Sequence, residues 1–196
     1  MSDLVLASGS QIRRQVLEGA GVPFSIIKPD VDEAVIKAER SGLAPVDMAL
    51  ELGKAKAESV SLSHPDKLVL GADQTMELEG RLLDKLPRPE LARGRLEAMR
   101  GRPHHLHSGL ALFRAGRPVW LYQQTSTLHV RDFSDAFLDM YLKNAGFALT
   151  ASVGAYAYEG LGAQLFSKVE GDYYAILGLP LLPLLRILRD QGVIVS

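Results

Sequence analysis

Residues able to bind an anion are grouped near the start of the chain, in the run LASGSQIRR (residues 6–14). Two arginines follow Ser-Gly-Ser at the start of an expected helix, where cationic side chains oppose the helix dipole. Ser8 and Ser10 supply hydroxyls, Gly9 allows close backbone approach, and free N–H groups at a helix N-terminus favour an anion. Arg13 adds a forked donor suited to phosphate oxygens. The pattern indicates a phosphate-binding corner; the alternative is an ordinary serine N-cap with solvated arginines.

Two acidic residues are candidates for the chemistry beside that corner. Asp73 follows Lys67–Gly71, an apolar run typical of a strand covered on both faces, where a charge is costly unless it is paired or binds metal. Glu33 ends the acidic segment Asp30–Glu33. Such oxygen ligands suit Mg²⁺ or Mn²⁺ bound together with substrate phosphates. The alternative is that Asp73 caps a turn and that the acidic segment is a solvated loop.

Lysines and histidines give weaker signals. Lys54 lies among small residues of an expected helix and Lys85 follows a predicted hairpin, so each by itself has the context of a surface lysine. His104, His105 and His107 suggest a metal site, but alternation along a strand puts only the last two on one face. We therefore interpret the histidines as part of a strand.

Alternating strand-like and helix-like segments must position these side chains. The predicted strands are Leu4–Ala7, Phe24–Ile27, Lys67–Gly71, Arg81–Leu83 (after a turn at Glu79-Gly80), His104–Phe113, Val119–Val130, a segment near Gln164–Val169, and Val193–Val195. The predicted helices are Gln11–Ala20, Pro45 to about Leu62, Pro89–Met99, one from the cap at Ser134 to Ala145, and Leu181–Asp190.

The mixed order of these segments predicts an α/β fold of the mixed α+β kind, with a central twisted mixed sheet flanked by helices. We find no linker or repeat, so residues 1–196 are expected to form a single domain. Polar residues just past strand ends line the ligand crevice of such sheets. The loops Ser8–Arg14, Asp30–Glu33 and Asp73–Thr75 are therefore expected to face the ligand.

Composition narrows the class of protein further. A net charge of −1 gives no bulk attraction to nucleic acid or membrane, and the lack of cysteine excludes disulfides, thiolate metal sites and cysteine nucleophiles. Met1-Ser2-Asp3 lacks the basic start of a secretory signal. The most apolar stretch, Ile176–Leu185, is about half a membrane span and holds two prolines. We expect a soluble cytoplasmic protein with neither nucleic-acid nor membrane partners.

In combination, the motifs resemble the Maf family of nucleoside triphosphate pyrophosphatases along nearly the whole chain. The resemblance is carried by LASGSQIRRQVLEGAGVPF (6–24), PDVDE (29–33), GKAKA (53–57), GADQ (71–74), LLDKL (82–86), HSGLAL (107–112), VEGDYY (169–174) and GLPL (178–181). It implies an elongated two-lobed fold, similar to that of inosine triphosphate pyrophosphatases, with a cleft between the lobes. It also implies that a nucleoside triphosphate is cut between its α and β phosphates to the monophosphate and pyrophosphate, and it suggests a homodimer.

The resemblance assigns roles to particular residues. Its polar active-site positions are Ser10, Arg13, Glu33, Lys54, Asp73 and Lys85. Asp73 falls on the residue usually assigned as proton acceptor, although a free aspartate, with a pKa of about 3.9, is a weak base near neutral pH. Our hypothesis is that Asp73 orients the attacking water and that Glu33 and Asp73 hold a divalent cation, Mg²⁺ or Mn²⁺. The basic residues and the cation would neutralise the phosphates.

Three positions separate the branches of the family by nucleobase, and here they are Ile12, Gln74 and Glu159. The branch that acts on dTTP and UTP usually has Arg, Thr and Gln there, whereas Gln74 and Glu159 resemble the 7-methyl-GTP branch. A carboxylate can accept both N1–H and N2–H of guanine. Ile12 replaces the aromatic residue expected in that branch, so it cannot stack as a cation–π partner.

We therefore predict 7-methyl-GTP as the substrate. The alternatives are a dTTP/UTP pyrophosphatase of the same family, a non-catalytic nucleotide-binding regulator of cell division, and a phosphatase of another fold that releases orthophosphate.

Overall fold

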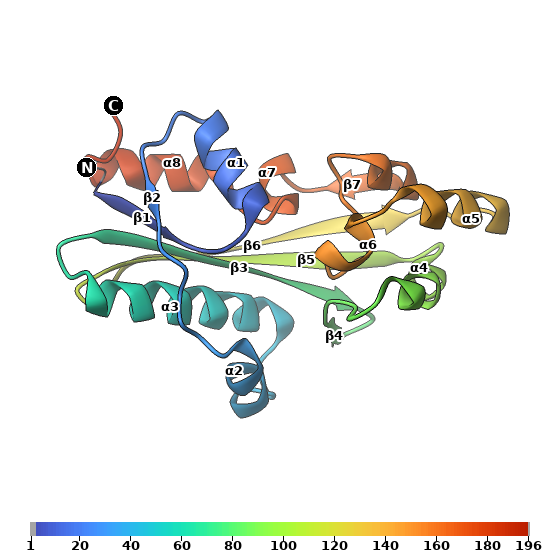
Figure 1. Ribbon diagram of the computed structural model, residues 1–196, viewed down its shortest axis with the longest axis horizontal. Helices are drawn as coiled ribbons and strands as arrows, with labels where there is room; N and C mark the ends of the chain where they lie inside the picture. Colours follow the sequence, from blue (N-terminus) through green and yellow to red (C-terminus); the bar gives the residue numbers. More distant parts are fainter. Residues whose placement is uncertain (1–2, 196) are drawn as a thin grey trace. The chain divides into compact units, whose positions relative to one another are not determined.

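The computed structural model describes residues 3–195 and shows helices and strands arranged around one sheet (Figure 1). In chain order the elements are β1 (Leu4–Ala7), α1 (Gln11–Gly19), β2 (Ser25–Ile26), α2 (Glu33–Glu39), α3 (Pro45–Ser63), β3 (Leu68–Leu78), β4 (Arg81–Leu83), η1 (Pro89–Leu91), α4 (Ala92–Met99), β5 (Pro103–Arg114), β6 (Arg117–Val130), α5 (Asp135–Asn144), α6 (Ala148–Ala151), η2 (Leu161–Leu165), β7 (Phe166–Glu170), α7 (Tyr173–Ile176) and α8 (Leu181–Asp190).

The sheet is mixed, with strand order β2-β1-β3-β5-β6-β7 and β4 paired to β3. β1 runs parallel to both β2 and β3, with Leu4 opposite Leu68 and Ala7 opposite Gly71. The β3–β4 and β6–β7 pairs are antiparallel. The prediction of a central mixed sheet flanked by helices is confirmed, whereas the elongated shape and the cleft between lobes stay predictions.

The chain divides into two compact units. The first comprises the described residues up to Gln74, His107–Gln124, and those from Asp172 onward; the second comprises Thr75–Leu106 and Thr125–Gly171. Strands β3, β5 and β6 each have residues in both units. That residues 1–196 act as one domain stays a prediction.

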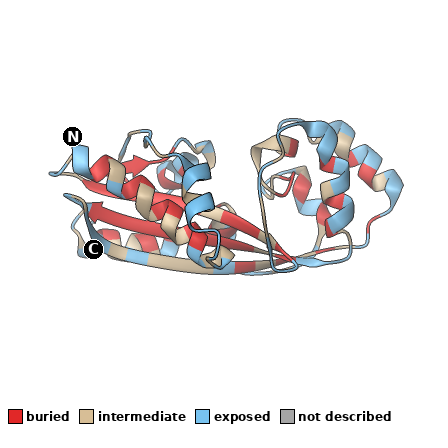
Figure 2. Ribbon diagram, turned by 90° about the horizontal axis from the view of Figure 1, so that it is seen from below, coloured by how far each residue is buried: buried red, intermediate tan, exposed pale blue. Residues whose placement is uncertain are grey.

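The first unit is a three-layer arrangement that follows from the side-chain alternation of β1. Leu4 and Leu6 pack into a core with residues of α1 and α8, such as Leu17. Val5 and Ala7 belong to a separate core with residues of α3. Alternate side chains of a strand point to opposite faces, so this short apolar strand is covered on both sides. Figure 1 shows α1 and α8 on one face and α3 on the other, and the strands between them are largely buried in Figure 2.

Close backbone contact sets the position of α3 on the sheet. A Cβ atom added to Gly71 would overlap the carbonyl oxygen of Gly53 and would lie 2.6 Å from the backbone nitrogen of Ala57. Glycine is therefore required at this point of β3, since a larger residue would push the helix away. The contact fixes the register of α3 against β3.

The second unit has a core of its own. Phe133, Leu138 and Tyr141 are buried around α5, and the Tyr141 hydroxyl donates a hydrogen bond of 3.0 Å to the Ala155 carbonyl. His104 of β5 is fully buried, with its Nε2 2.7 Å from the Tyr156 hydroxyl. As predicted, His104, His105 and His107 lie in a strand, β5.

The structure differs from the sequence-based expectation in several elements. β3 does not end before Asp73 but continues to Leu78, so the expected loop Asp73–Thr75 is strand. The predicted strand Val193–Val195 is wrong, because the Val193 N–H donates to Leu188 O and turns the chain at the end of α8. Helices α2, α6 and α7 were not predicted. Among the described residues, none of the helices has the length and apolar character that crossing a bilayer demands.

Candidate active site

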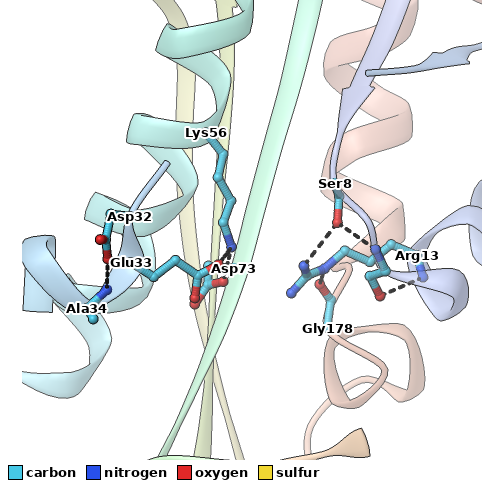
Figure 3. Close-up of polar contacts among 9 residues, drawn as sticks. Ser8, Arg13, Asp32, Glu33, Ala34, Lys56, Asp73 and Gly178 are labelled. Carbon is cyan, nitrogen blue, oxygen red and sulfur yellow. Dashed lines mark hydrogen bonds and ion pairs between the residues drawn. The ribbon is translucent and has the colours of Figure 1, made fainter. Parts of the chain in front are cut away.

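An ion-paired cluster on α2, α3 and β3 forms the centre of the candidate site (Figure 3). The Lys56 Nζ lies 2.5 Å from Oδ1 of Asp73 and 2.7 Å from Oε1 of Glu33. Lys56 is only 7% exposed and Asp73 only 8% exposed. One buried ammonium thus bridges the buried carboxylate of Asp73 and the exposed carboxylate of Glu33, and the pairing offsets the cost of burying Lys56 and Asp73.

Local structure explains how three distant segments meet at this ammonium. Lys56 lies on the buried face of α3, four residues after Leu52, and it directly precedes Ala57, which contacts Gly71. Asp73 comes two residues after Gly71 on β3, and the two residues share one face of the strand. The close approach of helix and strand therefore brings Lys56 next to Asp73.

Helix α2 presents the second carboxylate. Asp32 caps this helix, with Oδ1 accepting from Ala34 N at 3.0 Å and from Val35 N at 3.2 Å. Glu33 is the first helical residue, where a negative charge is favourable to the helix dipole. Burial acts to raise the pKa of Glu33, but the hydrogen bond and charge of Lys56, with the charges of Lys37 and Arg13, outweigh it and lower the pKa below its ordinary value. Glu33 is therefore held ionised at the site.

The predicted phosphate-binding corner is present at the junction of β1 and α1. The Ser10 hydroxyl caps α1 by accepting from Arg13 N at 3.4 Å, and the Ser10 N–H donates to the Ser8 hydroxyl at 3.1 Å. Arg13 is almost fully buried, with its Nε donating to Gly178 O at 2.9 Å and its Nη1 to Ser8 Oγ at 3.4 Å. In Figure 3 its guanidinium is directed toward the side on which Asp73 lies.

The charge of Arg13 is coupled to the acidic cluster. Burial lowers the pKa of Arg13, and the negative charges of Asp73 and Glu33 act against that shift. A guanidinium remains protonated in either case, so it supplies a permanent positive charge. The cluster and the corner therefore form one electrostatic site within the first unit.

The end of α7 and the segment after it contact this site through backbone carbonyls. Gln74 donates from Nε2 to Ala175 O at 2.9 Å and to Ile176 O at 3.2 Å. The Ser108 hydroxyl donates to the same Ala175 carbonyl at 3.0 Å. Gly178 has a φ of +86°, and a Cβ atom there would lie 3.4 Å from Arg13 Nη2, so glycine suits both the backbone and the neighbouring guanidinium. The amide nitrogen of Gln74 is thus engaged by backbone carbonyls.

The remaining predicted site residues lie elsewhere. Lys54 is on the same helix as Lys56 but pairs with Glu51 at 2.6 Å, not with Asp73. Lys85 and Glu159 are exposed residues of the second unit. Ile12 is partly buried in the first turn of α1, next to Arg13. The structure thus brings together Ser8, Ser10, Arg13, Glu33, Asp73 and Gln74, and the functions of all the predicted residues stay predictions.

Lys56 is the site residue that sequence reasoning missed. Its signal is helical spacing: Lys56 is seven residues after Ala49 and four after Leu52, so it falls on the buried stripe of α3, whereas Lys54 falls off it. A lysine on the apolar face of a helix indicates a buried partner, and that partner is Asp73.

The donor set fits a divalent cation of the Mg²⁺ or Mn²⁺ type. The Glu33 and Asp73 oxygens that bind Lys56 converge on one point, as two ligands of a single ion would. The described residues offer no third acidic or histidine side chain for a complete cage. Such ions keep waters and take substrate phosphates as ligands, so two carboxylates are a sufficient protein contribution.

Comparison with known proteins identifies the family of this chain. A family profile described as "Maf-like protein" matches residues 3–191. A "Nucleoside triphosphate pyrophosphatase" of Maricaulis maris is 75% identical over 99% of both chains, and one of Caulobacter vibrioides is 47% identical over 98% of this chain and 97% of that one. A "7-methyl-GTP pyrophosphatase" of Rhizobium meliloti is 44% identical over 97% of both chains.

A solved structure titled "Structure of a HAM1 protein from Coxiella burnetii" is 18% identical, covers 68% of this chain and 75% of that chain, and has a TM-score of 0.45. The family profile and the full-length relatives, rather than this solved structure, show the family. The chain belongs to the Maf family.

Proposed function

We propose that this Maf-family protein hydrolyses 7-methyl-GTP between the α and β phosphates to 7-methyl-GMP and pyrophosphate. The coarser part, that the chain is an enzyme of the nucleoside triphosphate pyrophosphatase class, rests on the relative of that name that is 75% identical along the full length. The observation that carries the chemistry is the ion-paired cluster of buried Lys56 and Asp73 with the exposed Glu33, to which Arg13 is coupled.

The basic residues take the phosphates in this proposal. Arg13 is held in place by Ser8 and Gly178, so its remaining donor atoms can bind phosphate oxygens without loss of side-chain freedom. The capped N-terminus of α1 lies directly beside it and favours the same anion. Lys85 is assigned to the phosphates by the family resemblance alone.

In this proposal the carboxylates orient the attacking water and hold the cation. Lys56 engages Oδ1 of Asp73, and we assign Oδ2 to the attacking water. Asp73 orients the water by accepting a hydrogen bond from it, the water oxygen forms the new bond to the α phosphorus, the bridging oxygen leaves with pyrophosphate, and the proton of the water is released to solvent. Glu33 and Asp73 would hold the divalent cation, which would supply positive charge to the phosphates.

The choice of base rests on Gln74 and Glu159. Glu159 can accept both donors of the guanine edge, and its charge favours the positively charged methylated ring. A 44% identical relative carries the name 7-methyl-GTP pyrophosphatase, which supports the assignment. We further propose that the protein acts as a cytoplasmic homodimer, which light scattering and fractionation would test.

A substrate panel tests the proposed function. We expect 7-methyl-GTP to be turned over fastest among 7-methyl-GTP, GTP, UTP and dTTP with Mg²⁺ or Mn²⁺, and chromatography to identify pyrophosphate as the product. Preference for UTP or dTTP would refute the assignment of the base. Binding without turnover would favour the regulator, and release of orthophosphate would exclude the class.

Asp73→Asn tests the role of the carboxylate. We expect turnover to fall about 100-fold, because misplacement of a reacting group by about 1 Å can cost about 10²-fold. Nucleotide affinity, measured by calorimetry without a divalent cation, should change little, since Arg13 and the α1 N-terminus remain. Unchanged turnover would show that Asp73 has no part in the chemistry.

A further inference from the structure

The ammonium of Lys56 occupies the point at which a cation would bind the two carboxylates. Its Nζ is within 2.7 Å of one oxygen from Glu33 and one from Asp73. Lys56 is 7% exposed, so these contacts replace the water that an exposed lysine would keep. An ammonium and a divalent ion both need oxygen ligands, and here they need the same two atoms.

We propose that Lys56 is the internal counter-ion of the Glu33–Asp73 site, that it competes with the divalent cation for these oxygens, and that the cation releases its ammonium. The proposal rests on the proposed function in its use of the cation. It makes Lys56 a positioning residue in the nucleotide-free state and a free donor once the cation is bound.

Charge balance favours exchange over joint occupation. Glu33 and Asp73 carry two negative charges, and Lys56 and the nearby Arg13 carry two positive ones. A divalent ion added beside both basic groups would leave a net charge of +2 in a largely buried site, which is costly. The cation therefore has to displace Lys56 or arrive together with an anionic nucleotide, so its affinity without nucleotide should be weak.

The released ammonium has a new partner available in the nucleotide. The backbone of α3 is held against β3 at Gly71, so only the four-carbon side chain of Lys56 has to move. A lysine bears three rotatable donors on a flexible stem, and a phosphate oxygen can replace the carboxylates that it leaves. Cation and triphosphate would then bind cooperatively, because each favours the same position of Lys56.

Cation binding without nucleotide tests the competition directly. In the proposed experiment, free Mn²⁺ is measured by electron paramagnetic resonance for the wild type, Lys56→Gln and the matched control Lys54→Gln. Lys54 is on the same helix but pairs with Glu51, so its variant removes an equal charge without touching the two oxygens. We expect Mn²⁺ to bind Lys56→Gln at least tenfold more tightly than the wild type. Equal or weaker binding by a folded Lys56→Gln protein would overturn the proposal.

Labelling of the wild-type chain provides a second measurement should Lys56→Gln fail to fold. An amine-reactive reagent should modify Lys56 slowly in the metal-free protein, because its nitrogen is buried and ion-paired. Saturating Mn²⁺ should raise that rate at least fivefold as read by peptide mass spectrometry, and the rate at Lys54 should stay constant. A Lys56 rate that does not respond to bound Mn²⁺ would contradict the release.

The two hypotheses fail separately. Tighter Mn²⁺ binding by Lys56→Gln in a protein that releases no pyrophosphate from any nucleotide would leave the competition intact and refute the proposed function. Pyrophosphate release by a protein whose Mn²⁺ affinity does not depend on Lys56 would support the proposed function and refute the competition.

Discussion

Acidification should destabilise this protein through His104. This side chain is fully buried in the second unit, in ring contact with Tyr156 and Phe166, and its Nδ1 has no hydrogen-bond partner among the described residues. Burial, with smaller effects from His105 and His129, lowers the pKa of His104 to about 3. Protonation therefore requires either an uncompensated buried charge or opening of the core.

The sign and size of the effect follow from the two pKa values. Because the folded-state pKa of His104 lies below the unfolded value of about 6.5, the unfolded chain binds more protons between pH 6.5 and pH 3. The stabilising contribution is complete above pH 6.5 and is lost as the pH falls toward 3. Each pH unit in that window costs about 1.4 kcal/mol, so lowering the pH from 7 to 5 costs about 2 kcal/mol. That is a large share of a typical stability of about 5–15 kcal/mol.

Urea unfolding followed by circular dichroism at pH 7, 6 and 5 measures this loss. His104→Gln removes the titrating group and can still hydrogen-bond the Tyr156 hydroxyl, so its stability should fall about 2 kcal/mol less than that of the wild type over the same range. His64→Gln is the matched control for replacing a histidine outside the core, because His64 is only partly buried, at the end of α3. Parallel curves for the wild type and His104→Gln would refute the reasoning.

Three further substitutions test the packing of α3, the phosphate corner and the hydrogen bonds of Arg95. Gly71→Ala should lower the free energy of unfolding by about 3 kcal/mol or more in thermal melts, because its Cβ would overlap the backbone of α3 near Ala57. Overpacking usually costs at least about 1 kcal/mol, so a smaller loss would show that the helix adjusts freely. Arg13→Lys keeps the charge but loses the forked donor, so KM should rise at least about tenfold in steady-state assays, and an unchanged KM would count against phosphate binding by Arg13. Arg95→Met removes the hydrogen bonds to Val153 O at 2.5 Å and Asp84 O at 3.1 Å and should lower stability in urea by about 1–3 kcal/mol; unchanged stability would show that neither bond stabilises the fold.

Much of the framework could be predicted because local pattern and tertiary structure agree. The run Leu4–Ala7 is apolar throughout, which predicts a strand covered on both faces, and both faces are in fact packed. The predicted start of α1 after Ser10 is confirmed, because that hydroxyl caps the helix. The end of β3 could not be predicted, since Asp73 has a low strand propensity and only the ammonium of Lys56 makes it tolerable inside the sheet.

The site was harder to predict than the framework because it depends on pairing between distant segments. Lys54 and Lys56 are chemically equivalent in the sequence, and only the buried stripe of α3 distinguishes them. Glu33 was expected in a loop, but the structure places it in a helix. Asp32 caps the short helix α2, and Glu33 is the first residue of that helix. Lys85 and Glu159 were predicted from the family resemblance, and both belong to the second unit.

The geometry of the ion pair depends on a residue that carries no side chain. A Cβ atom at Gly71 would force α3 away from β3, and Lys56 would be carried off with it, since it is adjacent to the contact at Ala57. A displacement of about 1 Å lengthens an ionic hydrogen bond of 2.5 Å beyond the usual range of about 2.7–2.9 Å. Gly71→Ala should therefore reproduce in milder form the tighter Mn²⁺ binding of Lys56→Gln, provided that the variant still folds. A folded Gly71→Ala protein with wild-type Mn²⁺ affinity would show that the side chain of Lys56, rather than the helix position, sets the contact.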